Sequence, residues 1–165
     1  MNELMNIVDS LITKDSVEEI LDHNDFTSEY GLTLTEAEAL EISNSRSNSL
    51  KENGRVEFGN EVINKMILEF CDSPYISSYN YADTLEKLLD IFYYYKNETM
   101  DIISDDELIE FMHTCFDGDS KGSVELLSHH ELKQATENLK NGHGFNCKEF
   151  DTLEEDFEGD EYGQY

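Results

Sequence analysis

Basic side chains are scarce in this chain of 165 residues: eleven lysines and arginines face 38 acidic residues, for a formal net charge of −27 at pH 7. Affinity for nucleic acid depends largely on lysine and arginine, and so does affinity for anionic membranes. We therefore expect no direct binding to nucleic acid or to a membrane. A field this negative should instead attract cations or a basic protein partner. Acidity that serves only solubility or salt adaptation is the simpler alternative.

Cysteine, proline and long apolar runs are also rare. The three cysteines are odd in number and widely spaced, which argues against a disulfide framework. The N-terminus lacks the basic start and apolar run of a signal peptide. No stretch approaches the roughly 20 apolar residues that a membrane-spanning helix needs. These absences predict a cytoplasmic protein.

Motifs that would anchor catalysis are missing as well. The sequence contains no G-x-S-x-G elbow, no P-loop and no G-x-G-x-x-G. Cys71 is followed by Asp72 in an acidic chain, and a cysteine nucleophile needs cationic surroundings instead. Among 38 acids, carboxylate pairs for acid–base catalysis can be drawn almost anywhere. We predict that the chain is not an enzyme and requires no cofactor.

Helical periodicity is the main feature that is present. Scarce proline and many leucine, isoleucine, glutamate and lysine residues favour helices. Apolar residues at helical spacing predict two short helices within residues 1–24, an amphipathic helix over 62–70 that Pro74 ends, and a central helix over 81–103. We expect an all-α fold, a compact single-domain bundle of about six or seven helices over residues 1–144. No internal repeat recurs at a solenoid period.

Three capping boxes mark further helix starts, at Thr35, Ser104 and Ser128, each with a glutamate three residues later. The first of these helices would run to Gly54. Residues 43–49 within it are rich in serine and asparagine, which divert backbone hydrogen bonds, so a flexible linker is the alternative there. Arg55, one of two arginines, is expected to pair with a nearby carboxylate.

The segment 145–165 differs in character and is predicted to be an extended acidic tail. Residues 149–161 hold eight acids and no base, interleaved with aromatic side chains. Such a segment can dock on a basic, partly apolar groove, or it can be a disordered, solvating end. The partner-binding residues predicted in it are Phe150, Phe157, Tyr162, Glu154, Glu155 and Asp156.

Tyrosines cluster around Pro74 and include the run from Tyr93 to Tyr95. Burial at the core and its rim is the simpler explanation, because tyrosine buries its ring while its hydroxyl finds a partner. Tyrosine is also enriched at interface hot spots. We therefore name Tyr75 and Tyr79 as a second predicted contact surface.

The spacing of the possible metal ligands argues against a metal site. Residues 117–125 match the opening of an EF-hand loop, but Lys121 stands where an oxygen ligand belongs and Ser128 replaces the bidentate glutamate. We expect an ordinary turn here, with a degenerate EF-hand-like metal-binding module as the alternative. The spacings of the histidines and cysteines differ from those of structural zinc sites: His113, Cys115, His129, His130, His143 and Cys147.

Four strings of residues resemble a family of small uncharacterised acidic proteins from clostridial-type Firmicutes: 70–76, 79–85, 91–99 and 103–111. The resemblance extends over roughly residues 32–141. It implies a bacterial, cytoplasmic, helical protein and brings no known activity.

Taken together, charge, tail composition and missing catalytic motifs predict a non-enzymatic protein-binding module, an adaptor or regulatory subunit that contacts a basic partner. A DNA-mimic inhibitor of a nucleic-acid-binding protein is the alternative. Mimicry needs carboxylates in rows on one contiguous face. Here the acids are spread over every predicted element, which favours the protein-binding hypothesis.

Overall fold

Residues 13–146 are described by the computed structural model, and within that range the regular structure is entirely helical. Residues 13–22 are helical and lead into α2 (Asn24–Thr27) and a short 3-10 helix, η1 (Ser28–Tyr30). The expected all-α fold is confirmed. The longer elements that follow are α3 (Glu36–Glu52), α4 (Glu61–Phe70), α5 (Tyr81–Glu98) and α6 (Asp105–Asp117).

The last helix changes its winding along its length. It begins as α7 (Val124–Leu126), continues as a π-helical segment, η2 (Leu127–Leu132), and ends as α8 (Lys133–Lys140) without a break. The capping box predicted at Ser128 is therefore wrong. The Ser123 hydroxyl caps this helix instead, because it accepts a hydrogen bond from the Leu126 N–H at 3.1 Å, and Ser128 lies inside the helix.

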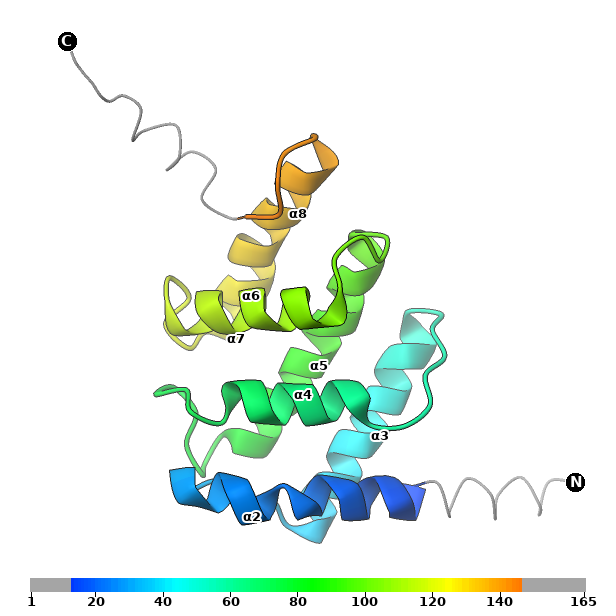
Figure 1. Ribbon diagram of the computed structural model, residues 1–165, viewed down its shortest axis with the longest axis vertical. Helices are drawn as coiled ribbons and strands as arrows, with labels where there is room; N and C mark the ends of the chain where they lie inside the picture. Colours follow the sequence, from blue (N-terminus) through cyan, green and yellow to red (C-terminus); the bar gives the residue numbers. More distant parts are fainter. Residues whose placement is uncertain (1–12, 147–165) are drawn as a thin grey trace, which may run out of the picture.

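The helices are stacked in two layers (Figure 1). One layer contains residues 13–22 with α2, then α4 and α6; the other contains α3, α5 and α8, which cross behind it at an angle. The chain alternates between the layers, and helices of the same layer pack side by side: α3 packs on α5, and α4 packs on α6.

Two of the predicted capping boxes are confirmed. The Thr35 hydroxyl accepts from the Glu38 N–H at 3.1 Å, and the Glu38 carboxylate accepts from the Thr35 N–H at 2.9 Å. Ser104 and Glu107 form the same reciprocal pair at the start of α6. Each box satisfies N–H groups that the first helical turn leaves without partners.

The polar interval 43–49 is helical, so the linker alternative is wrong. Three of its polar side chains are buried and bonded to other elements: Ser43 to Ser16 at 3.1 Å, Ser49 to Asp90, and Arg46 to the Gly59 carbonyl. These tertiary hydrogen bonds stabilise the helix where the intrinsic propensity of serine and asparagine is weak.

The core lies between the two layers. Its largest fully buried side chains include Phe70, Phe92, Tyr93 and Phe116, and the rings of Phe70 and Phe116 meet edge to face at 5.5 Å. The central helix is shorter than predicted, because α5 ends at Glu98 and a turn follows. No helix within residues 13–146 is long and apolar enough to cross a membrane.

Candidate functional site

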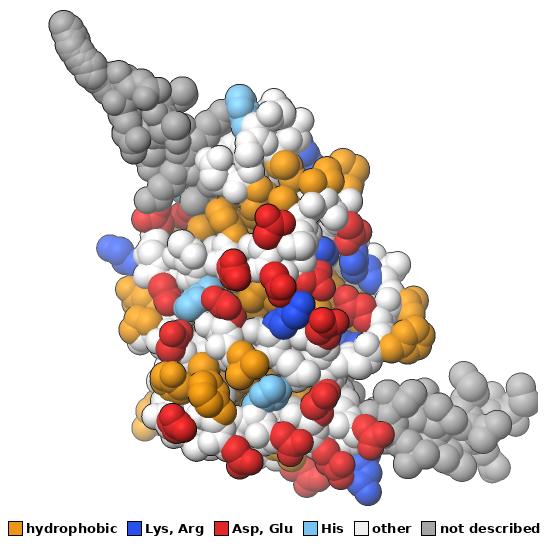
Figure 2. Space-filling model, in the orientation of Figure 1, with side chains coloured by type: hydrophobic (Ala, Val, Ile, Leu, Met, Phe, Trp, Pro, Cys, Tyr) orange, Lys and Arg blue, Asp and Glu red, His pale blue; other side chains and the backbone are white. Residues whose placement is uncertain are grey.

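Two loops lie along one side of the stacked helices and expose large hydrophobic side chains. Residues 53–60 connect α3 to α4, and residues 99–104 connect α5 to α6; we call them the loop pair. Figure 2 shows hydrophobic surface along the edge where these loops lie in Figure 1. Four hydrophobic side chains of the two loops are largely exposed, and we call them the apolar quartet: Val56 (79% exposed), Phe58 (91%), Met100 (70%) and Ile102 (62%).

Arg55 joins the two loops. Its Nη2 lies 2.8 Å from Oδ1 of Asp101, and its Nη1 lies 3.2 Å from Oδ2. The same Nη1 donates to the Asn97 side-chain oxygen at 2.7 Å, and Asn97 in turn donates to the Asn53 carbonyl at 2.7 Å. The hydrogen bond from Arg55 holds the pKa of Asp101 below its ordinary value of 3.8. The expected pairing of Arg55 with a carboxylate is confirmed.

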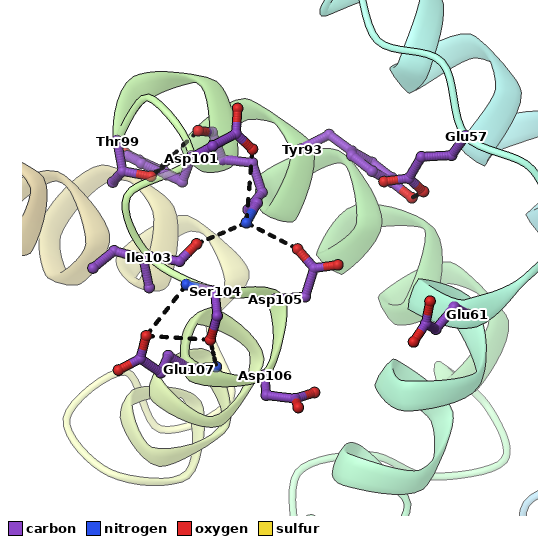
Figure 3. Close-up of polar contacts among 12 residues, drawn as sticks. Glu57, Glu61, Tyr93, Thr99, Asp101, Ile103, Ser104, Asp105, Asp106 and Glu107 are labelled. Atoms are coloured by element: carbon purple, nitrogen blue, oxygen red, sulfur yellow. Dashed lines mark hydrogen bonds and ion pairs between the residues drawn. The ribbon is translucent and has the colours of Figure 1, made fainter.

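Lys96 binds residues at both ends of the second loop, and Figure 3 marks these contacts with dashed lines that reach Asp101, Ile103 and Asp105. Its side chain is buried, and its ammonium donates to the Ile103 carbonyl at 2.7 Å. The same ammonium lies 2.9 Å from Asp105 and 3.7 Å from Asp101. One buried cation therefore ties the last turn of α5 to the start of α6 and fixes the loop between them. A buried charge needs such partners.

The second loop also contains strained backbone. Met100 and Asp101 have φ values of +54° and +58°, in the left-handed region that residues other than glycine rarely adopt. The Met100 N–H donates to the Asn97 carbonyl and the Asp101 N–H to the Lys96 carbonyl, both at 2.9 Å. Such strain persists only where surrounding contacts determine the conformation, and it is often found at functional sites. Here it turns Met100 outward.

Carboxylates lie on and beside the loop pair. Glu57, Glu61, Asp105 and Asp106 lie on this side of the molecule (Figure 3). The Tyr93 hydroxyl donates to Glu57 at 2.6 Å, and burial, followed by this contact, raises the pKa of Tyr93. Exposed apolar side chains and carboxylates therefore occur together at the loop pair, and this combination suits a surface that is both basic and apolar.

The predicted tyrosine surface lies elsewhere. Tyr75 and Tyr79 are in the segment between α4 and α5, at the end of α4 opposite the loop pair. Tyr79 is 97% exposed, whereas Tyr75 is 39% exposed and its ring meets Phe116 edge to face at 6.3 Å. The three tyrosines of the run 93–95 differ in exposure: Tyr93 and Tyr95 are buried, and Tyr94 is half exposed.

The tail residues named above lie outside the described residues: Phe150, Phe157, Tyr162, Glu154, Glu155 and Asp156. The sequence did not single out the apolar quartet. The sequence feature that could have indicated the quartet is a few apolar residues beside turn-forming ones, such as Val56 and Phe58 between Gly54 and Gly59.

Residues 117–125 comprise the end of α6, a turn over 118–123 and the start of α7. The Asp117 carboxylate accepts a hydrogen bond from Ser73 at 2.6 Å and lies 2.9 Å from Nε2 of His113. The other ring nitrogen of His113 lies 2.8 Å from Glu69. These contacts join α6 to α4. Within residues 13–146, no group of three or more histidine, cysteine, aspartate or glutamate side chains is placed to hold a metal ion.

Comparison with known proteins gives a family and no activity. No curated protein and no solved structure matches the chain. A family model covers residues 19–144, most of the chain and including both loops of the loop pair. The protein belongs to that family, described as a family of unknown function (DUF6323).

Proposed function

We propose that the protein is a non-enzymatic protein-binding module, an adaptor or regulatory subunit in the cytoplasm of a clostridial-type bacterium, that contacts a basic partner through the loop pair. The observation that carries the proposal is the apolar quartet, exposed on two loops that Arg55 and Lys96 hold in place, with carboxylates nearby.

Exposure of the quartet favours a binding role. Single exposed hydrophobic residues are normal on protein surfaces, whereas a group of them on adjoining segments marks an interaction site. Arg55 and Lys96 fix both loops before any partner arrives. Because the loops are already ordered, binding would lose less conformational entropy than it would with flexible loops.

Charge favours a different protein over a second copy. Two copies that met through their loop pairs would bring the same carboxylates together, against a net charge of −27 on each. A basic partner would instead be attracted, and its association would slow as salt rises. The tail residues Phe150, Phe157 and Tyr162 would add a second acidic and aromatic contact, as the sequence predicts.

The test is affinity purification from the native host at low salt, followed by binding of the two purified proteins. We expect the full-length protein to retain a basic protein, and a Phe58→Ser, Met100→Ser variant to lose it. Leu126→Ser is the matched control, because Leu126 is 49% exposed on α7, at the other end of α6. Equal affinity of the loop variant and the control would refute the role of the loop pair.

A second pair of variants tests the other predicted surfaces. Removal of residues 147–165 tests the tail, and Tyr79→Ser tests the tyrosine surface. A surface belongs to the interface only if its loss weakens binding of the purified partner. Binding that is unaffected by salt would contradict the electrostatic part of the proposal.

A further inference from the structure

A groove of about 560 Å³ lies between the second half of α5 and the last helix, away from the loop pair. Tyr94, Tyr95 and Glu98 line it from α5, and residues of η2 and α8 line it from the other side. The Tyr95 hydroxyl donates to the Ser128 carbonyl at 2.5 Å, in the π-helical segment. π-Helical segments within α-helices are often found at functional sites.

The lining of the groove is close to neutral on a strongly acidic molecule, because its two lysines are balanced by Glu98 and Glu137. Lys133 and His129 are exposed, and no carboxylate within residues 13–146 forms an ion pair with Lys133. Lys140 also lines the groove, 3.3 Å from Glu98. α8 carries two lysines and one glutamate, whereas every other helix within the described range carries more acids than bases. The groove should therefore repel an anion less than the more acidic helices do.

The lining also holds an unused hydroxyl and an aromatic face. Thr136 is 4% exposed, and its Oγ1 has no hydrogen-bond partner in the described structure. A buried hydroxyl without a partner is unfavourable and calls for a ligand or water. Tyr94 is 50% exposed and stands edge to face with Tyr95 at 4.9 Å, so its ring offers an apolar contact at the edge of the groove.

The chain continues after α8 into an acidic and aromatic segment, residues 147–165, whose chemistry matches the groove. The Asn138 side chain donates to the Asn146 carbonyl at 2.6 Å, so the last described residue lies against α8, and Asn138 is next to Glu137, which lines the groove. A helix is about 10–12 Å wide. The residues 147–165 could span up to about 60 Å when extended, enough to pass around α8 and along the groove.

We infer that in the free protein the acidic and aromatic segment 147–165 docks in the groove between α5 and α8, with its carboxylates near Lys133 and His129 and an aromatic side chain on Tyr94. Its eight acids between residues 149 and 161 match the ammonium of Lys133, which is unpaired within residues 13–146, and Phe150, Phe157 and Tyr162 match the exposed ring of Tyr94. The inference concerns the free protein and does not depend on the proposed partner.

The experiment places a nitroxide spin label on the segment of the full-length protein, at Glu158→Cys with Cys147→Ser, and records amide signals of the ¹⁵N-labelled chain. Cys71 and Cys115 are buried, so the label should attach at residue 158. We expect the signals of Tyr94, His129 and Lys133 to lose intensity, while those of α3 keep theirs. About 0.5 M salt should restore the lost intensity, because screening weakens the attraction between the segment and the lysine. Intensity loss that is absent, or equal over all helices, would overturn the inference.

Two controls make the result specific. Lys133→Glu should restore the signals around the groove, whereas Lys51→Glu, at an exposed lysine on α3, should leave the intensity loss unchanged. A mixture of spin-labelled protein without ¹⁵N and ¹⁵N-labelled protein without a spin label tests docking between copies. Intensity loss at the groove in that mixture would show that the segment of another copy binds there, and would refute docking within one chain.

Discussion

Arg55 and Asp101 are 46 residues apart in the sequence and meet through two N–O contacts, at 2.8 and 3.2 Å. The pair joins the two loops that carry the apolar quartet. Arg55 is the more buried partner, with its side chain 20% exposed against 54% for Asp101. An ion pair with one exposed member contributes little to global stability. Its main effect is therefore local, on the relative position of the loops.

Asp101→Asn should lower the free energy of unfolding by about 0.5–1 kcal/mol at pH 7. The hydrogen bond from Arg55 keeps the pKa of Asp101 in the folded protein below its ordinary value of 3.8. The stability from this group is therefore present above that value and is lost as the pH falls through the lowered pKa. Urea unfolding at pH 7 and below pH 3 checks this, since the difference from the native protein should disappear in acid. In an Arg55→Leu background, Asp101→Asn should have a smaller effect at pH 7, because only the contact with Lys96 at 3.7 Å remains.

Lys96→Met should destabilise the protein by about 2 kcal/mol. The substitution leaves the Ile103 carbonyl and the Asp105 carboxylate without their cation, at 2.7 and 2.9 Å from the present ammonium. Lys87→Met is the matched control, because Lys87 pairs with Asp83 on the same helix and both are largely exposed. The control should cost less than about 0.5 kcal/mol. Equal urea midpoints for the two variants would contradict a structural role for Lys96.

Helices with strong periodicity could be predicted from the sequence, and α4 and α6 lie close to their expected positions. The start of the last helix could not be predicted from the sequence. Ser128 and Glu131 have the spacing of a capping box, but the same spacing occurs inside a helix, and here Tyr95 binds the Ser128 carbonyl from another element. Helix α3 was uncertain for a similar reason, because Ser49 is held by Asp90 on α5.

The corrected helix start leads to a direct test. Ser123→Ala should cost about 1 kcal/mol, because the Ser123 hydroxyl accepts from the Leu126 N–H at 3.1 Å. Ser128→Ala should change the stability by less than about 0.5 kcal/mol, because alanine is a better helix former and the observed contact uses the Ser128 backbone. Thermal unfolding of both variants distinguishes the two possible starts. A larger loss for Ser128→Ala would support the start predicted from the sequence.

The candidate site was the least predictable part of the molecule. That Arg55 would pair with an acid could be inferred from its rarity, but not which of 38 acids it would choose. The sequence also predicted that the central helix would continue to Ile103, because Met100 and Ile102 are apolar. The turn at Met100 and Asp101 depends instead on contacts with Arg55 and Lys96, which only the folded chain brings together.

Gly122→Ala should destabilise the protein more than Gly31→Ala. Both glycines have positive φ, +81° and +78°, so alanine would be strained at either position by about 1 kcal/mol. At Gly122 an added Cβ would also lie 2.5 Å from the Tyr75 Cβ, whereas at Gly31 it would meet nothing within 4 Å. We expect an additional loss of about 1–3 kcal/mol at Gly122. Equal unfolding free energies of the two variants would show that the segment around Tyr75 moves away from the added methyl group without loss of stability.

Alkaline pH should destabilise the native protein more than a Tyr81→Phe variant. Tyr81 is 2% exposed, and burial raises its pKa from 10.0 to about 12. Between these values the unfolded chain loses the phenol proton while the folded chain keeps it, so stability is complete below pH 10 and falls as the pH rises toward 12. The loss from Tyr81 should reach about 2 kcal/mol near pH 12.

Urea unfolding at pH 8 and pH 11.5 measures this loss, and the difference between the two pH values should be smaller in Tyr81→Phe. Burial also raises the pKa of Tyr93, so the variant should retain part of the alkaline sensitivity. Tyr79→Phe is the control, because its side chain is 97% exposed and should give the same difference as the native protein. If Tyr81→Phe lost as much stability as the control, the phenol of Tyr81 would be accessible to solvent and the packing of α5 against Thr27 would need revision.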